Sequence, residues 1–207
     1  MKDNRLKEQV MKDVREALME RNIIGEGDNH IPDGKTFLAA DGNDLSVTFA
    51  KNFTAAGGIM YYCYNEQDIM ARIKEIQKSN NDEPIACASD NLNTFLGHLD
   101  IKNKCSCNIN ERHPFGAILC EALLAWNGSV VLSSNQGIGT SIASLFSTTI
   151  VLAFTSQVVP DWEIAHERIK NLYDRFPDNI VITNPSAQSY RKGQQKIYLI
   201  LIEDETN

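Results

Sequence analysis

The stretch GSVVLSSNQGIGTSIASLF, from Gly128 to Phe146, decides how this chain folds. It begins with a continuous apolar run, Val130 to Leu132, which is typical of a strand that is covered on both faces. Strand and helix patterns alternate along much of the rest of the chain, so we expect parallel strands joined by right-handed crossovers. The predicted fold class is α/β, a mostly parallel sheet flanked by helices, with residues 130–132 in the middle of the sheet.

A Gly- and Ser-rich turn follows this predicted strand. Gly137 and Gly139 let the backbone turn sharply or approach a ligand closely, and Thr140 or Ser141 can cap the helix that comes next. A helix N-terminus presents backbone N–H groups that suit an anion. Two interpretations stay open: an anion site that also includes Ser134, or a tight connection without a ligand. The turn lacks the Gly-Lys-Ser/Thr of a Walker loop.

The remaining patterns divide the chain into three parts. These are an N-terminal helix (1–22), a Gly-, Asp- and Asn-rich loop that we expect to be mobile (23–44), and a single α/β domain (44–207). Within the domain we expect helices that begin at about residues 45, 66, 91, 116 and 162. The expected strands besides 130–132 are 59–64, 84–88, 104–109, 149–154, 179–183 and 196–202.

Composition limits the classes of function. The chain has 207 residues, 43% of them hydrophobic, and a net charge of -7. This supports a sizeable core and argues against a nucleic-acid binder, which needs a basic face. We find no stretch of about 20 apolar residues that would span a membrane and no signal peptide. The sequence therefore predicts a cytoplasmic protein.

Cysteine and histidine give little support for a metal centre. The chain has five cysteines, which we expect to be thiols. The pair Cys105-x-Cys107 does not have the spacing of a structural zinc pair or an iron–sulfur cluster, both of which use two intervening residues. His30 and His113 are isolated in the sequence. We therefore expect no metal and no cofactor.

Glu121 is the candidate catalytic residue. It lies in an apolar segment, where burial would raise the pKa of its carboxyl group and suit it to acid or base chemistry. The alternative is an exposed position on the outer face of the predicted helix.

Asn184 and Ser186 directly follow a predicted strand. Ligands of open α/β sheets gather at the carboxyl ends of strands, so this turn and the turn after residue 136 could face one crevice. Arg191 and Lys192 could add positive charge there, or belong to a solvated loop. Asn127 completes the candidate ligand-binding set.

Two segments of the chain resemble the LUD-domain family, the group of lactate-utilisation protein C and YkgG. They are AILCEALLAWNGSVVLSSNQGIGTSIASLFSTTIVLAFTSQVVP, which starts at Ala117, and VITNPSAQSYRKGQQKIYLILIED, which starts at Val181. The resemblance implies a fold like that of ribose-phosphate isomerase and the CoA transferases. It also implies a role beside iron–sulfur partner proteins in oxidising lactate to pyruvate.

The chain departs from the family pattern at several positions. The family's glutamate before Thr-Gly is Trp126 here, and the arginine expected after the glycine turn is replaced by Thr140. Glu121 falls where the family tends to have aspartate. We therefore expect an accessory or small-anion-binding subunit. The alternatives are a stand-alone enzyme acting on a sugar phosphate or acyl-CoA, or an interaction protein with a decayed site. A homo-oligomer is compatible with the sequence.

Overall fold

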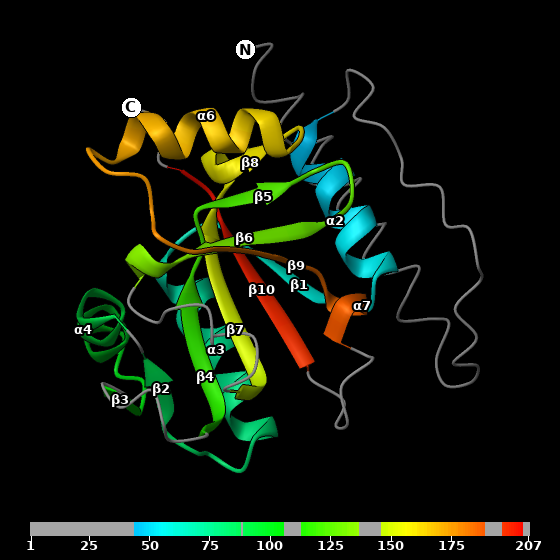
Figure 1. Ribbon diagram of the computed structural model, residues 1–207. Helices are drawn as coiled ribbons and strands as arrows, with labels where there is room; N and C mark the ends of the chain where they lie inside the picture. Colours follow the sequence, from blue (N-terminus) through cyan, green and yellow to red (C-terminus); the bar gives the residue numbers. More distant parts are fainter. Residues whose placement is uncertain (1–43, 88, 106–112, 137–145, 189–195, 205–207) are drawn as a thin grey trace, which may run out of the picture.

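The computed structural model describes residues 44–87, 89–105, 113–136, 146–188 and 196–204 (Figure 1). The predicted N-terminal helix and the predicted mobile loop before Asp44 lie outside these residues. In the described part, no helix is long and apolar enough to cross a membrane.

The larger of two sheets has six strands, and all of its neighbouring pairs are parallel. This confirms the predicted α/β class with a mostly parallel sheet. Strands β7 and β4 lie in the interior of the sheet and β1 and β3 at its edges. In spatial order the strands are β1 (Ile59–Cys63), β10 (Lys196–Ile202), β7 (Phe146–Phe154), β4 (His113–Leu119), β2 (Ile85–Cys87) and β3 (Asn103–Cys105).

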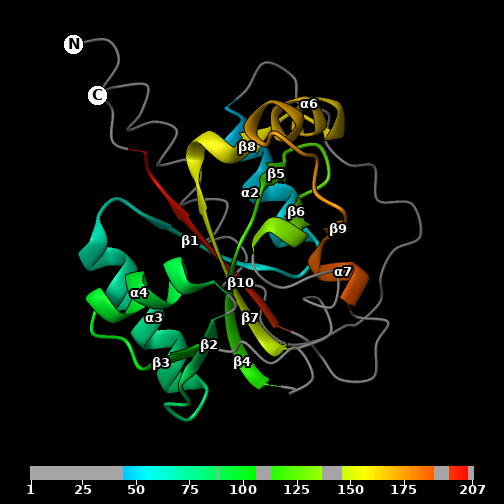
Figure 2. The same ribbon diagram turned by 60° about the vertical axis from the view of Figure 1, so that its left-hand side comes forward.

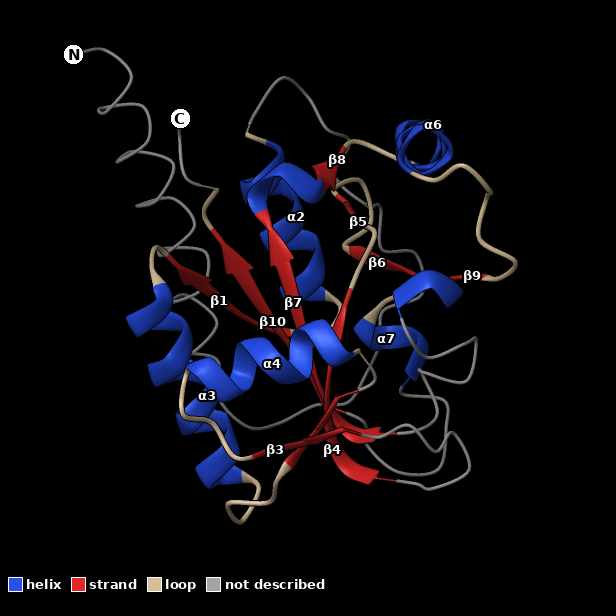
Figure 3. Ribbon diagram, turned by 90° about the vertical axis from the view of Figure 1, so that its left-hand side faces the viewer, coloured by secondary structure: helices blue, strands red, loops and turns tan. Residues whose placement is uncertain are grey.

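Helices cover both faces of this sheet (Figure 3). Helices α3 (Glu66–Ser79) and α4 (Asp90–His98) pack on one face, and α2 (Leu45–Ala55) packs on the other. Two of the three begin as the sequence predicts. The Asp44 side chain accepts a hydrogen bond from the Ser46 N–H at 2.8 Å, and Asn65 accepts one from the Asp68 N–H at 2.9 Å.

A second sheet of four strands packs beside α2, and α6 (Trp162–Leu172) covers its outer face (Figure 2). Its spatial order is β8 (Val158–Val159), β5 (Ala122–Leu124), β6 (Ser129–Ser133) and β9 (Ile180–Thr183). Three short helical segments complete the described fold: η1 (Ser134–Gln136), η2 (Thr155–Gln157) and α7 (Pro185–Gln188).

Two predictions about the central stretch need correction. Residues 130–132 do form a strand buried on both faces, but this strand, β6, is interior to the smaller sheet and pairs antiparallel with β5 and β9. The helix predicted from Gly116 to Ala125 is wrong, because these residues form most of β4 and all of β5. A run that is apolar on every side satisfies a buried helix and a buried strand equally well, so periodicity cannot separate them.

The turn between β5 and β6 is fastened to α2. Asn52 of α2 donates hydrogen bonds to the carbonyl oxygens of Ala125 at 2.7 Å and Trp126 at 3.1 Å. Gly128 has a φ of +66°, and a Cβ placed on it would lie 2.4 Å from the Phe53 nitrogen. Glycine is required here both for the left-handed backbone and for the close approach of the helix.

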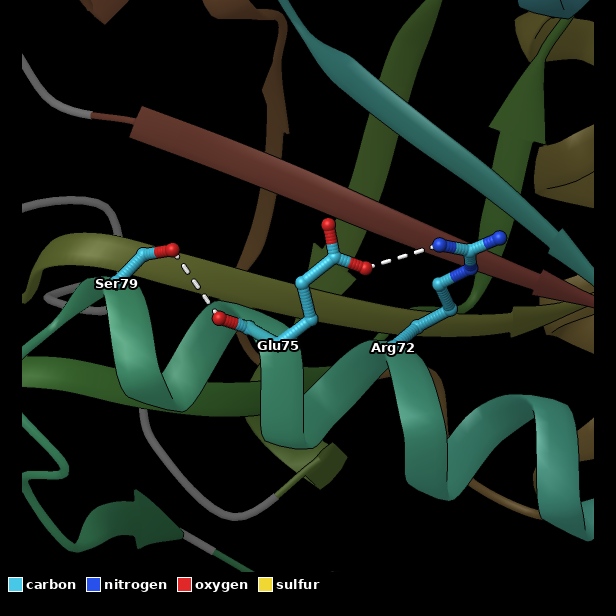
Figure 4. A network of polar contacts seen from close by, with 3 residues as sticks. All are labelled: Arg72, Glu75 and Ser79. Carbon is cyan, nitrogen blue, oxygen red and sulfur yellow. Dashed lines mark hydrogen bonds and ion pairs between the residues drawn. The ribbon is translucent and has the colours of Figure 1, made fainter.

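The exposed face of α3 carries a local polar network (Figure 4). Arg72 Nη1 lies 2.9 Å from Glu75 Oε2, and the Ser79 hydroxyl donates to the Glu75 carbonyl oxygen at 3.1 Å. The Arg72 guanidinium also lies 5.2 Å from the centre of the Tyr61 ring. Because the Arg72 and Glu75 side chains are about half exposed, this ion pair contributes little to stability.

Candidate functional site

The candidate site lies where three neighbouring strands of the main sheet end. Strands β10, β7 and β4 are adjacent and parallel, so their carboxyl ends share one edge of the sheet. In open α/β sheets this edge is the usual place for ligands. The chain places polar side chains within two residues of each of these ends, and two groups of them stand out, one around Glu121 and one around Asp204.

Glu121 lies in the link between β4 and β5, where the chain passes from the large sheet to the small one. Its side chain is buried and accepts a short hydrogen bond from the Ser133 hydroxyl at the end of β6. The Tyr173 hydroxyl lies 3.0 Å from Oε1 and 3.1 Å from Oε2 of the same carboxyl group. The Glu121 backbone N–H donates to the Val131 carbonyl oxygen at 2.8 Å.

These contacts decide between the two alternatives for Glu121, a buried position and an exposed position on the outer face of a helix. The residue is buried, and it does not lie on a helix. A buried carboxylate is tolerated when hydroxyl groups replace its lost water. Here the hydroxyls of Ser133 and Tyr173 do so, and they connect β6 and the end of α6 to the start of β5. Glu121 is thus a fixed hydrogen-bond acceptor that holds three elements together.

Gln157 connects this region to the end of β7. Its side-chain N–H donates to the Cys120 carbonyl oxygen at 2.6 Å, and its side-chain oxygen accepts from the Phe154 N–H at 2.7 Å. Since Cys120 directly precedes Glu121, Gln157 fixes the backbone of the residue before the buried carboxylate. The side-chain amide of Gln157 makes both contacts, because its nitrogen donates to Cys120 and its oxygen accepts from Phe154.

Asp204 is the shared acceptor of the second group of polar contacts. Its carboxylate accepts hydrogen bonds from the Thr155 hydroxyl at 2.8 Å, the Ser156 N–H at 2.5 Å and the Ser156 hydroxyl at 3.0 Å. Burial acts to raise the pKa of Asp204, but the hydrogen bonds from Thr155 and Ser156 outweigh it and hold the pKa below its usual range. Arg168 donates a short hydrogen bond to the Ser156 carbonyl oxygen and adds positive charge nearby. The carboxylate is therefore stabilised in its ionised form.

The structure separates the described residues of the predicted ligand set. Strands β6 and β9 are antiparallel, with Val130 opposite Thr183. Asn184 therefore lies beside the start of β6, whereas Ser134 follows its end, where the Ser134 N–H donates to the Asn179 carbonyl oxygen at 3.0 Å. We expected one crevice because the carboxyl ends of parallel strands share one edge of a sheet. Since β6 and β9 are antiparallel, this reason does not apply to Ser134 and Asn184.

Local contacts account for three of the predicted residues, Asn127, Asn184 and Ser186. Asn127 lies at the β5–β6 turn, and its side chain accepts a hydrogen bond from the Ser129 N–H at 3.0 Å. The Ser186 hydroxyl donates to the Asn184 side chain at 3.0 Å. These hydrogen bonds link residues two apart in the sequence, as is usual for turns. The side-chain contacts of Asn127, Asn184 and Ser186 are therefore explained by local turn structure, without a ligand.

Other predicted residues lie outside the described part of the chain. These are Gly137, Gly139, Thr140, Ser141, Arg191, Lys192, Cys107 and His30. Among the described residues, no group of three or more His, Cys, Asp or Glu side chains is arranged to hold a metal ion.

The sequence did not identify several residues of this edge. Ser133 adjoins the predicted turn, but the sequence pointed to its neighbour Ser134 instead. Tyr173 lies 52 positions from Glu121, and neither its residue type nor its spacing pointed to the contact. Thr155, Ser156 and Gln157 follow a correctly predicted strand, so the rule that polar groups collect after parallel strands could have found them.

Comparison with solved structures shows a known fold. The crystal structure of a DUF162 family protein from Deinococcus radiodurans is similar to this chain with a TM-score of 0.61. The match covers 76% of this chain and 96% of that chain, at 10% sequence identity. The shared property is therefore the α/β fold. No family model and no curated protein sequence matches the chain.

Proposed function

We propose that this chain is a LUD-domain protein that binds a small anion and serves as an accessory subunit in the oxidation of lactate to pyruvate. The observation that carries the proposal is the likeness of fold to a DUF162 family protein, because DUF162 is in general the same family as the LUD domain. The sequence resemblance in residues 117–160 and 181–204 points to the same family independently of that structure. The proposed partners are iron–sulfur oxidoreductase subunits.

The proposed ligand is a small carboxylate or phosphate. The support comes from the glycine turn of the sequence, where Gly137, Gly139 and the hydroxyls of Thr140 and Ser141 suit an anion bound through N–H and O–H groups. An arginine after this turn, as the family resemblance implies, would add a charge-assisted hydrogen bond of roughly twice the usual strength. Because Thr140 stands there, the proposed binding is weak.

In this proposal Glu121 is a positioning residue. Its carboxyl oxygens accept hydrogen bonds from Ser133 and Tyr173, and these contacts fix the start of β5 against β6 and α6. A carboxylate held in this way supports the architecture beside the carboxyl edge of the sheet. The proposal therefore requires no proton transfer by Glu121.

A stand-alone enzyme acting on a sugar phosphate or an acyl-CoA is the second candidate, and the burial of Glu121 favours it. In that case Glu121→Gln, which keeps the size and one acceptor oxygen, would abolish turnover while the protein stays folded. In the accessory proposal, Glu121→Gln changes stability and leaves anion affinity within about twofold. The third candidate, an interaction protein with a decayed site, predicts no anion binding.

Direct interaction tests the partner. Genes for iron–sulfur oxidoreductase subunits next to the gene for this chain would supply the candidates. Co-expression of those subunits with the full chain, followed by size-exclusion chromatography, should yield a complex. Lactate oxidation by the complex should fall when the chain is omitted. Separate elution of all subunits and unchanged lactate oxidation without the chain would contradict the accessory role.

A further inference from the structure

Two cysteines occupy paired positions on neighbouring strands at one edge of the main sheet. Strands β2 and β3 are parallel, and Cys87 of β2 is the register partner of Cys105 of β3. Adjacent strands lie about 4.8 Å apart, which falls within the Cα separation of about 4.4–6.8 Å that a disulfide needs. Register partners also point to the same face of a sheet. The backbone therefore meets the first conditions for a cross-link.

Contacts with α4 place both side chains on the same face of the sheet. Cys105 Sγ donates a hydrogen bond to Asp90 Oδ1 at 3.4 Å, and Asn103, two residues earlier, donates to Asn93 Oδ1 at 3.1 Å. Asp90 and Asn93 both belong to α4. Cys87 lies in the buried cluster that includes the inner face of this helix. Both sulfur atoms are therefore on the side that α4 covers.

The two thiols differ in accessibility, which assigns them different roles. Cys105 is exposed, whereas Cys87 is fully buried. Burial, with a smaller contribution from the nearby Cys105, raises the pKa of Cys87 to about 12. A buried thiol of this kind does not react first with a dissolved oxidant. Cys105 is the accessible thiol, and it lies on a three-residue strand at the edge of the sheet.

We propose that Cys87 and Cys105 form a site of reversible disulfide formation that responds to hydroperoxides. The Cys105 thiol gives up its proton and its sulfur attacks the peroxide, so that an S–O bond forms and the O–O bond breaks; the departing oxygen takes up that proton and leaves as water or an alcohol. The Cys87 sulfur then attacks the Cys105 sulfenic acid, the S–S bond forms, and the hydroxyl leaves as water with the Cys87 proton. Two thiols are oxidised and one peroxide is reduced. The inference is independent of the proposed anion binding.

The other described cysteines provide internal controls. Cys63 has Ile202 as its register partner, and Cys120 lies in the link between β4 and β5. Both are buried. They share the burial of Cys87 but have no cysteine opposite them in the described pairing, so they should remain thiols under the same treatment.

Peptide mapping of the full-length protein tests the proposal. The protein is treated with hydrogen peroxide, its remaining thiols are alkylated, and it is digested with trypsin without reduction. Lys102 and Lys104 separate the Cys87 peptide from the peptide that contains Cys105 and Cys107. We expect a cross-linked pair of these peptides, loss of two of the five thiols, and recovery of both on adding a thiol reductant.

Variants separate this disulfide from its alternatives. Cys107→Ser should leave the cross-link unchanged, and Cys105→Ser should abolish it while Cys87 is recovered alkylated. Because Cys105 is exposed, Cys105→Ser keeps the test valid if a substitution at Cys87 prevents folding. An internal Cys105–Cys107 disulfide, Cys107 in place of Cys105 in the cross-link, or sulfinic acid at Cys105 with Cys87 still a thiol would each overturn the proposal.

Discussion

The Tyr173 hydroxyl donates to the carboxyl group of Glu121, lying 3.0 Å from one oxygen and 3.1 Å from the other. Tyr173 directly follows α6, and Glu121 directly precedes β5. This contact therefore joins the helix that covers the small sheet to the point where the chain leaves the large one. Without this contact, the buried carboxyl group of Glu121 would lose one of its hydrogen-bond donors.

Removing this hydroxyl should destabilise the protein. We expect Tyr173→Phe to lower the free energy of unfolding by about 1–3 kcal/mol, since a buried acceptor loses a donor. Urea unfolding followed by circular dichroism measures this difference. Tyr64→Phe is the control, because Tyr64 is exposed and a surface change of this kind stays within about 0.5 kcal/mol. Equal effects of the two variants would show that the Tyr173 contact does not stabilise the fold.

Two glycines should respond in opposite directions to substitution by alanine. Gly128→Ala places a Cβ against the backbone of α2 and forces a left-handed φ on alanine, so we expect a loss of about 1–3 kcal/mol or more. Gly97 of α4 has no atom within 4 Å of the position that a Cβ would occupy, and Gly97→Ala should stabilise the helix by about 0.5–1 kcal/mol. Thermal unfolding should give a lower Tm for the first variant and a higher one for the second. A Gly128→Ala protein as stable as the wild type would mean that α2 does not approach the β5–β6 turn this closely.

The Asp204 contacts predict a dependence of stability on pH. The pKa of Asp204 is lower in the folded protein than its ordinary value of 3.8, so its ionised form stabilises the fold above that pH. This contribution is lost as the pH falls through the lowered pKa. We expect Asp204→Asn to cost about 1 kcal/mol at pH 7, the typical net value of one hydrogen bond, and the difference from the wild type to shrink below pH 3.8.

Unfolding at several pH values measures this effect. Asp178→Asn serves as the matched control, because Asp178 forms only an exposed ion pair with Arg175 among its described contacts, and such pairs contribute little. A stability difference for Asp204→Asn that stays constant from pH 7 to pH 3 would contradict the assigned role of the ionised carboxylate.

Local signals in the sequence predicted much of the fold. The helices predicted to begin at about residues 45, 66 and 162 are present, and the residues before them, Asp44, Asn65 and Asp161, each accept a hydrogen bond from the first turn. The apolar run from residue 196 to residue 202 predicted β10. These features depend on residues that are neighbours in the chain, which is why they could be read from the sequence.

Long-range partners could not be predicted in the same way. The sequence predicted that residues 130–132 form a buried strand, but which sheet they join depends on pairing with β5 and β9. Strand β9 is distant in the chain, and β5, although it is close, was predicted as part of a helix. The same holds for Glu121, whose burial was one of two open alternatives. Its partner Tyr173 is 52 residues away. Pairing of this kind is decided by packing of the whole domain rather than by local propensity.

The central claim is that the chain binds a small anion and does not oxidise lactate by itself. Isothermal titration of phosphate, lactate, pyruvate and coenzyme A into the full chain tests it most directly, with Gly139→Asp as the variant that adds a negative charge to the predicted turn. We expect weak binding of at least one of these anions, at least tenfold weaker binding to Gly139→Asp, and no lactate turnover by the isolated chain. Binding that Gly139→Asp leaves unchanged, the absence of binding by all four ligands, or turnover of lactate without partner subunits would contradict it.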